Sequence, residues 1–178
     1  ATGSGPLVPP IPGIDEVPYH TNETIFDLRE RPSHLVIIGG GPIGMEMAQA
    51  HIRLGSKVTV IEGEKALGRE DPEAAALVLE RLRDEGVEIV EGTKAERVSG
   101  GEGSVTVHTA QGEIAGSHLL VAVGRKVNVD KLDLDKAGVK TTRTGVEVDA
   151  GLRTANRRVY AIGDAAGGLQ FTHVASYH

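Results

Sequence analysis

The sequence has 178 residues, of which 39% are hydrophobic, and a formal net charge of −6. This length suits one domain with appendages, and the mixture of acids and bases argues against nucleic acid as a partner. No apolar run approaches membrane-spanning length, so we expect no membrane partner and a cytoplasmic location. The chain has no cysteine, which excludes disulfides and thiolate chemistry within it.

The first residues are predicted to be an extended connector. Residues 1–18 contain five of the eight prolines and few helix signals, a composition that is typical of extended chain. We expect one short helix over Thr24–Arg31, ending before Pro32.

The central signal is an apolar run, Leu35–Ile38, that is followed at once by glycines. A short, largely β-branched run of this kind predicts a strand buried on both faces of a parallel sheet. Gly39, Gly41 and Gly44 then have the spacing G-x-G-x-x-G. The first permits the sharp turn, the second lets a pyrophosphate approach the backbone, and the third lets a helix pack closely on the strand.

A helix is expected to start inside this turn. Pro42 suits the first helical position, where no amide donor is needed. The unpaired amides around Ile43 and Gly44 would face an arriving anion. Gly55 is placed to end the helix with a left-handed cap. The predicted buried stripe consists of Ile43, Met47, Ala50 and Leu54.

A second strand, Lys57–Ile61, ends at Glu62, where this arrangement places an acid on the adenosine ribose hydroxyls. That acid would repel a 2′-phosphate, and Glu64 adds to the preference for NAD. Lys65 and Arg69 weaken the preference because bases in this loop can receive the 2′-phosphate of NADP. The same pattern would also suit FAD or the adenosyl group of S-adenosylmethionine.

The next elements continue an alternating α/β order. Asp71 and Pro72 predict a helix start, and Ala75, Val78, Leu79 and Leu82 form its expected buried stripe. A third parallel strand is expected at 87–90, followed by an antiparallel meander of strands at 93–99, 104–109 and 113–115, and a buried strand at 118–123. We expect a short helix or turn near 132–138 and a small strand at 145–148. The segment 158–164 is predicted to be a strand that delivers the carboxylate of Asp164.

Four motifs occur in a fixed order: ATGS at 1–4, GGGPIGMEMA at 39–48, LLVAVGRKVN at 119–128 and YAIGDAAG at 160–167. Together they resemble the flavoprotein disulfide reductases, the pyridine nucleotide-disulfide oxidoreductase family that includes dihydrolipoamide dehydrogenase, glutathione reductase and mercuric reductase. The resemblance implies an α/β fold: a Rossmann-like parallel sheet with an antiparallel β-meander crossover, flanked by remnants of a second, FAD domain.

The resemblance also implies roles toward NAD. Glu62 would hold the adenosine ribose, Ala95 would lie on the adenine side, and Gly124 would lie beside the nicotinamide nucleotide. Glu46 would reach toward flavin and nicotinamide, or alternatively would only complement the helix dipole. The pyrophosphate turn would consist of Gly39, Gly41, Pro42, Ile43 and Gly44.

Further residues would border FAD in the parent enzyme. Thr2 and Gly3 would lie beside it, Asp164 would bind the ribityl chain, and Thr172 would offer its backbone near the isoalloxazine. Asp164 has a second interpretation as a helix N-cap ahead of Ala165. Arg125 and Lys126 would either favour a nucleotide phosphate or be solvated charges. The seven histidines show no metal-binding spacing, and His108 and His118 have no acidic companion at ligand spacing.

The sequence departs from the family in lacking the first FAD motif and the paired redox cysteines. We therefore expect residues 1–32 to be a connector from the FAD domain, 33–125 the NAD(P)-binding domain and 126–178 a partial return into the FAD domain. The parent would be a homodimer that passes hydride between NAD(P)H and FAD, and onward to a disulfide, a metal ion or another acceptor. The fragment alone would be catalytically inert. Two alternatives are a free-standing NAD-binding or sensing module and a methyltransferase, against which YAIGDAAG speaks.

Overall fold

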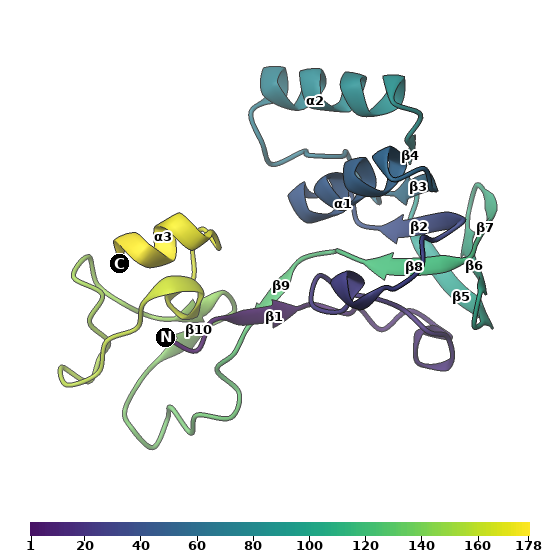
Figure 1. Cartoon of the computed structure of the whole chain (residues 1–178). Coiled ribbons are helices and arrows are strands. Elements are labelled where there is room, and N and C mark those ends of the chain that lie inside the picture. The colour runs from purple at the N-terminus through teal and green to yellow at the C-terminus, as the bar shows by residue number, and fades with distance from the viewer. The chain divides into compact units, whose positions relative to one another are not determined.

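The computed structural model describes all residues from 1 to 178. It divides into two compact units, Pro6–Gly124 and the combination of Ala1–Gly5 with Arg125–His178, which are described separately (Figure 1). The larger unit contains η1 (Ile14–Glu16), η2 (Ile25–Asp27), β2 (His34–Ile38), α1 (Pro42–Arg53), β3 (Lys57–Ile61), α2 (Pro72–Asp84), β4 (Glu88–Val90), β5 (Ala95–Gly101), β6 (Ser104–Thr109), β7 (Gly112–Gly116) and β8 (His118–Val121). The smaller unit contains β1 (Ser4–Pro6), β9 (Arg125–Val127), β10 (Thr141–Thr142), β11 (Gly145–Val146), η3 (Gly163–Ala166) and α3 (Thr172–Tyr177).

The larger unit is built around a four-stranded sheet in the order β4-β3-β2-β8, with every pair parallel. The strands end in register, because Ile38 of β2 lies beside Ile61 of β3 and Val121 of β8. Parallel neighbours need crossover connections, and α1 and α2 supply two of them. The predicted α/β fold with a Rossmann-like parallel sheet is confirmed.

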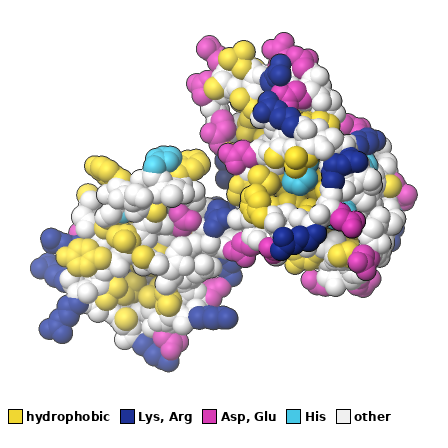
Figure 2. Space-filling view, in the orientation of Figure 1, with side chains coloured by type: hydrophobic (Ala, Val, Ile, Leu, Met, Phe, Trp, Pro, Cys, Tyr) yellow, Lys and Arg dark blue, Asp and Glu magenta, His cyan; other side chains and the backbone are white.

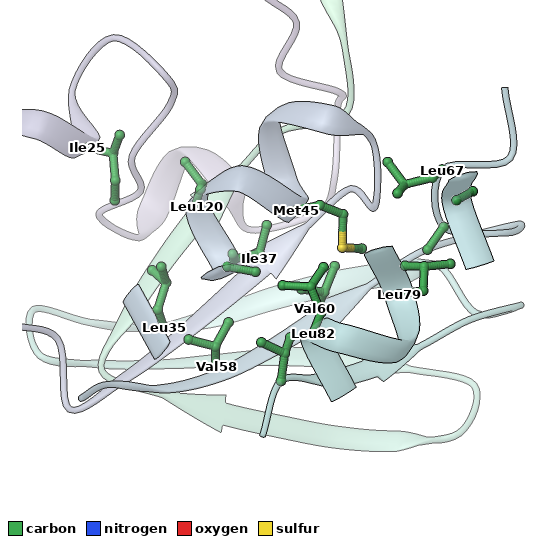
Figure 3. Close-up of a cluster of buried hydrophobic side chains, with 14 residues drawn as sticks. Ile25, Leu35, Ile37, Met45, Val58, Val60, Leu67, Leu79, Leu82 and Leu120 are labelled. Carbon is green, nitrogen blue, oxygen red and sulfur yellow. The ribbon is translucent and has the colours of Figure 1, made fainter. Parts of the chain in front are cut away.

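Strand β2 is buried on both of its faces. Leu35 and Ile37 point into a first core, where Met45 of α1 and Leu82 of α2 also pack (Figure 3). Val36 and Ile38 belong to a second core. Alternate side chains of a strand point to opposite faces, so an uninterrupted apolar run is what a sheet covered on both sides requires.

The second core lies between the parallel sheet and the antiparallel meander β5-β6-β7. Its meander side consists of Val98, Val105 and Val107, all almost completely buried. A Cβ on Gly116 of β7 would come within 2.6 Å of Val36 Cγ2, so glycine permits the close approach of the two layers. The predicted meander is confirmed, although β5 begins and ends two residues later than predicted and β7 extends one residue further at each end.

The predicted buried stripe of α1 is wrong except for Met47, which is partly buried against the first core. The buried residues are Gly44, Met45, Ala48 and His51, whereas the exposed fraction of Leu54 is 68%. Hydrophobicity alone misplaces the stripe because the contact face uses small residues for close packing. The contact face also includes His51, a polar residue that is buried and whose Nδ1 lies 2.8 Å from the Met47 carbonyl oxygen. In α2, Ala75, Leu79 and Leu82 are buried as predicted, but Val78 is exposed.

The N-terminal segment of the larger unit also differs from the expectation. Ile14 and Val17 are buried in the second core, so this stretch is packed and not a loose connector. The Val98 amide donates to the Pro12 carbonyl oxygen over 2.8 Å, which attaches the segment to β5. The predicted helix at 24–31 is reduced to the single turn η2, because Leu28 turns to an extended ψ of 130°.

The smaller unit has little regular structure. Val139, Val146 and Ala161 form its core. The strand predicted at 158–164 is absent, and only an isolated bridge joins Tyr160 to Arg153. A strand needs a neighbouring strand whose backbone groups accept and donate its hydrogen bonds. In this unit Tyr160 pairs with Arg153 alone, so no strand forms.

The helices and surface add two observations. No helix in the structure combines the length and apolar character that crossing a bilayer requires. Figure 2 shows acidic and basic side chains interspersed over the visible face of the larger unit.

Helices α1 and α2 are joined by an ionic cluster at Glu85. Arg53 of α1 donates from Nε and Nη2 over 2.8 and 2.7 Å, and Arg81 of α2 donates from Nε over 2.6 Å. The hydrogen bonds from Arg53 and then Arg81 lower the pKa of the Glu85 carboxyl to about 2. Because the pKa is depressed in the folded state, the cluster stabilises the fold above the unfolded pKa. That contribution is lost as the pH falls from 4.5 toward 2.

We predict that Glu85→Gln lowers the unfolding temperature at pH 7, and that the difference from the wild type shrinks as the pH falls through this window. Thermal unfolding followed by circular dichroism between pH 7 and pH 2 measures both effects. Glu80→Gln is the matched control, since Glu80 is an exposed acid of α2 that joins no ion pair in the structure. A pH-independent difference for Glu85→Gln would contradict the prediction.

Candidate functional site

The glycine turn at the end of β2 is shaped by contacts within the chain. Gly39 has φ of 112°, and a Cβ there would lie 2.4 Å from the Ala122 carbonyl oxygen. A Cβ on Gly44 would lie 2.0 Å from the Gly39 carbonyl oxygen. Both distances are far below van der Waals contact, so helix α1 can approach β2 this closely only with glycine at these positions.

Gly41 is different, because nothing in the chain requires glycine there. Its φ of −79° and ψ of −177° suit any residue, and no atom lies within 4 Å of the position that a Cβ would take. It is the N-cap of α1 and makes no side-chain capping bond. The first-turn amides of Ile43 and Gly44 have no partner inside the helix. The open side of the turn therefore combines free space with backbone donors.

Glu62 lies beside this turn, at the end of β3. Its Oε2 accepts a hydrogen bond from the Gly40 amide over 2.7 Å, and its Oε1 accepts one from the Glu64 amide over 2.9 Å. A Cβ on Gly40 would lie 3.0 Å from Glu62 Cβ. Each carboxylate oxygen can accept a second hydrogen bond. The acid is thus held by backbone donors while it keeps acceptor capacity for a ligand.

The loop after Glu62 folds back over the turn. The Leu67 amide donates to the Gly40 carbonyl oxygen over 2.8 Å, and Leu67 adopts a φ of 51°. Ala66 and Leu67 are buried, whereas Lys65 and Arg69 are exposed. Neither Lys65 nor Arg69 takes part in an ion pair of the structure, so both charges are free to meet a phosphate.

The other residues predicted to contact NAD occupy separate positions of the larger unit. The Thr93 amide donates to the Glu62 carbonyl oxygen over 3.1 Å, which brings the segment before Ala95 beside the acid. Gly124 has φ of 139° and follows β8, next to β2 in the sheet. Glu46 is exposed on α1 and joins no ion pair. The hydroxyl of Thr93 is buried without a hydrogen-bond partner.

The residues predicted to border FAD belong to the smaller unit. Gly3 has φ of 69° with no atom within 4 Å of a Cβ position, and the carbonyl oxygens of Thr2 and Gly3 both accept hydrogen bonds from Asn128. Thr172 is the first residue of α3. Asp164 lies inside η3, whose N-cap is Ile162, so the N-cap interpretation of Asp164 is wrong.

Arg125 is also not the solvated charge that one interpretation expected. Its guanidinium donates to the Ser4 hydroxyl over 2.6 Å and to the Ser4 carbonyl oxygen over 2.7 Å. Its Nε lies 3.8 Å from Asp164 Oδ2. Lys126, in contrast, is exposed and pairs with Asp130. Sequence reasoning missed the cluster of Ser4, Arg125 and Asp164, because only pairing of distant segments brings these side chains together.

The histidines form no group that could hold a metal ion. His108 does have an acidic neighbour, since its Nδ1 lies 2.9 Å from Glu113 Oε1 across the meander, which the sequence spacing did not reveal. Burial lowers the pKa of His20 and of His34.

Comparison with known proteins shows the family of the whole chain. The family model described as pyridine nucleotide-disulphide oxidoreductase matches residues 1–178. A mercuric reductase of Acidithiobacillus ferrooxidans is 38% identical over 99% of this chain and 32% of its own length. The probable pyridine nucleotide-disulfide oxidoreductase RclA of Escherichia coli is 40% identical over 98% of this chain and 40% of its own length. The solved structure of RclA, described as an HOCl-induced flavoprotein disulfide reductase, superimposes with a TM-score of 0.92 at 39% identity, covering 98% of this chain and 41% of that one.

The chain therefore belongs to the pyridine nucleotide-disulphide oxidoreductase family, as the ordered motifs predicted. It is part of an enzyme family of oxidoreductases that use flavin and pyridine nucleotides. The chain spans about a third to two fifths of the length of the curated relatives that it matches.

We predict stability effects of different size for two glycines of the turn. Gly44→Ala should destabilise the fold by about 1–3 kcal/mol, because the added methyl group collides with the backbone of Gly39. Gly41→Ser should change stability by less than about 0.5 kcal/mol, because its Cβ enters open space and serine is a good N-cap. Urea unfolding of both variants measures the difference. Equal stability losses would show that Gly41 is needed by the chain itself.

Proposed function

We propose that residues 33–125 are the NAD-binding domain of an FAD-dependent oxidoreductase, that residues 1–32 are the connector from its FAD domain, and that residues 126–178 are a partial return into that domain. One observation carries the proposal: an open glycine turn, with free first-turn amides, lies directly beside an acid that backbone amides hold in place. Structural turns use glycine to avoid contacts within the chain, as at Gly39 and Gly44. At Gly41 no contact within the chain requires glycine, and the open space beside it would accommodate a ligand.

In this proposal the pyrophosphate of the dinucleotide binds at the turn formed by Gly39, Gly41, Pro42, Ile43 and Gly44, where helix amides and the helix dipole favour negative charge. Glu62 accepts hydrogen bonds from the adenosine ribose hydroxyls. Ala95 lies on the adenine side, and Gly124 lies beside the nicotinamide nucleotide. Glu46 is exposed and has no ionic partner in this chain, so it could pair with a cationic side chain of the parent enzyme.

We propose NAD as the preferred nucleotide. A 2′-phosphate would bring its negative charge to the Glu62 carboxylate, whose orientation is fixed by Gly40 and Glu64. The exposed Lys65 and Arg69 would reduce this penalty, so NADP binds more weakly but is not rejected.

The smaller unit would contribute to the flavin site through Thr2, Gly3, Asp164 and Thr172. The residues fit this role: Gly3 leaves open space, and Asp164 Oδ1 accepts no hydrogen bond from the chain. Bound flavin and nicotinamide supply the hydride-transfer chemistry, and the protein supplies orientation and exclusion of water. Because the chain has no cysteine, it provides no redox thiol, and we propose that it is inert alone.

The parent enzyme would be a homodimer in the cytoplasm. Its acceptor would be a disulfide, a metal ion or another small molecule; relatives named mercuric reductase favour the metal-ion class. A second candidate is a free-standing NAD-binding module without catalysis, because the larger unit has two cores of its own that enclose the parallel sheet.

Calorimetric titration of the chain with NADH and NADPH tests the proposal. We expect saturable NADH binding, weaker NADPH binding, and a loss of NADH affinity in Glu62→Ala of about tenfold to a hundredfold, the usual cost of losing hydrogen bonds to a charged group. The same variant should lose its preference for NADH over NADPH. Glu80→Gln is the matched control, because Glu80 is an exposed acid of α2 that has no proposed role toward the nucleotide and accepts no side-chain hydrogen bond in the structure.

Gly41→Ser should also weaken NADH binding, while it folds normally. Unchanged NADH affinity in both Gly41→Ser and Glu62→Ala would contradict the proposed site. Tight binding that is independent of any flavin domain, in a stable oligomer of defined size, would favour the free-standing module.

A further inference from the structure

A polar cluster in the smaller unit joins three residues that are far apart in the sequence. The Ser4 hydroxyl donates to Asp164 Oδ2 over 2.5 Å and accepts from Arg125 Nε over 2.6 Å. Arg125 Nη2 donates to the Ser4 carbonyl oxygen over 2.7 Å. The serine hydroxyl therefore stands as a bridge between the cation and the carboxylate.

The backbone fixes the geometry of this bridge. Strand β1, which begins at Ser4, pairs with β9, which begins at Arg125. Two hydrogen bonds from Asn128, to the carbonyl oxygens of Thr2 and Gly3, continue the attachment on one side. Ser4 is thus held beside Arg125 by the pairing of main chains, and neither side chain has to be ordered by the carboxylate.

The carboxylate of Asp164 is used on one side only. Arg125 Nε lies 3.8 Å from Oδ2, too far for the two parallel bonds that an arginine and a carboxylate form in a direct pair. Oδ1 accepts no hydrogen bond from the chain. The side chains of Arg125 and Asp164 are 23% and 17% exposed. The fully buried side-chain oxygens that lack a hydrogen-bond partner are those of Ser56 and Thr93, so Asp164 Oδ1 is still reachable. It can therefore accept a hydrogen bond from a ligand hydroxyl.

We propose that Ser4 and Arg125 are positioning residues that orient the Asp164 carboxylate for a polyol hydroxyl of the flavin, an inference that rests on the proposed role of Asp164 toward FAD. Ser4 engages Oδ2, which fixes the plane of the carboxylate and leaves Oδ1 to accept the ligand hydroxyl. Arg125 holds the Ser4 hydroxyl through Nε, so the proton of that hydroxyl is directed at Oδ2. Arg125 acts through Ser4 and does not itself bond the carboxylate.

The competing explanation is purely structural: the cluster would only attach β1 to the smaller unit. The two explanations differ in whether variants that remain folded lose flavin affinity. They also differ in whether the effect of Ser4 depends on Asp164, because a positioning residue has nothing to position once the carboxylate is gone.

The test uses the full-length flavoprotein that contains this sequence. Its FAD is removed, and rebinding is measured by the quenching of flavin fluorescence in Ser4→Ala, Arg125→Met, Asp164→Asn and the Ser4→Ala/Asp164→Asn double variant. We expect Ser4→Ala and Arg125→Met each to weaken FAD binding about tenfold, as for the loss of one charge-assisted hydrogen bond. In the Asp164→Asn background, Ser4→Ala should have little further effect. Ser4→Thr, which keeps the hydroxyl, should retain the affinity.

Lys126→Met is the matched control, since it removes the neighbouring cation of β9, which pairs with exposed Asp130. NADH affinity and unfolding temperature are recorded for every variant. NADH affinity should be unchanged by Ser4→Ala, and the unfolding temperature shows whether each variant is folded. Unchanged FAD affinity in Asp164→Asn would overturn the proposed flavin role of Asp164 itself. A large effect of Asp164→Asn with none from Ser4→Ala and Arg125→Met would overturn only the positioning inference. An equal effect of Ser4→Ala with and without Asp164 would also overturn it.

Discussion

The larger unit depends on how closely helix α1 approaches the end of strand β2. The Gly44 backbone lies so near the Gly39 carbonyl oxygen that a single methyl group would reach within 2.0 Å of it. This contact sets the direction of α1, and with it the direction of the first-turn amides of the helix. It also places Met45 and Ala48 in the first core, together with Leu35 and Ile37. The arrangement of the core and the orientation of the unpaired first-turn amides thus follow from one steric constraint.

The acid of the proposed site is held in place by main-chain groups. The Gly40 and Glu64 amides hold the Glu62 carboxylate, and the Gly40 carbonyl oxygen accepts from the Leu67 amide. One residue, Gly40, therefore connects the turn, the acid and the following loop. Side chains in this loop can change while the acid stays in place, because the donors that hold it belong to the backbone. Lys65 and Arg69 are exposed positions of this kind.

Local patterns in the sequence were sufficient for the parallel sheet, the glycine turn and the meander. Each of these has a local signature in the sequence: uninterrupted apolar runs, glycines with the spacing G-x-G-x-x-G, and alternating strand patterns separated by Gly-rich turns. The buried stripe of α1 was misplaced because its contact face includes small residues and a hydrogen-bonded histidine. A pattern based on large apolar residues does not identify either kind of residue as buried. The strand expected at 158–164 failed for another reason, since strand structure depends on a neighbour and a segment's own sequence does not supply one. The cluster of Ser4, Arg125 and Asp164 was invisible for the same reason, because 121 and 160 residues separate its members.

The two-sided burial of β2 has a consequence for how the sheet is aligned. In a strand with one solvent-exposed face, a register shift of one residue is disfavoured because it would expose the apolar side chains. Leu35, Val36, Ile37 and Ile38 would remain apolar on both faces after such a slip, so their pattern alone does not fix the alignment. Polar groups at the two ends of the strand do: the Gly39 amide bonds the Ile61 carbonyl oxygen, and Ser117 exchanges hydrogen bonds with the His34 backbone. The alignment of the sheet is therefore anchored at the glycine turn itself, and an insertion or deletion in that turn would shift the strand as well as the site proposed for the nucleotide.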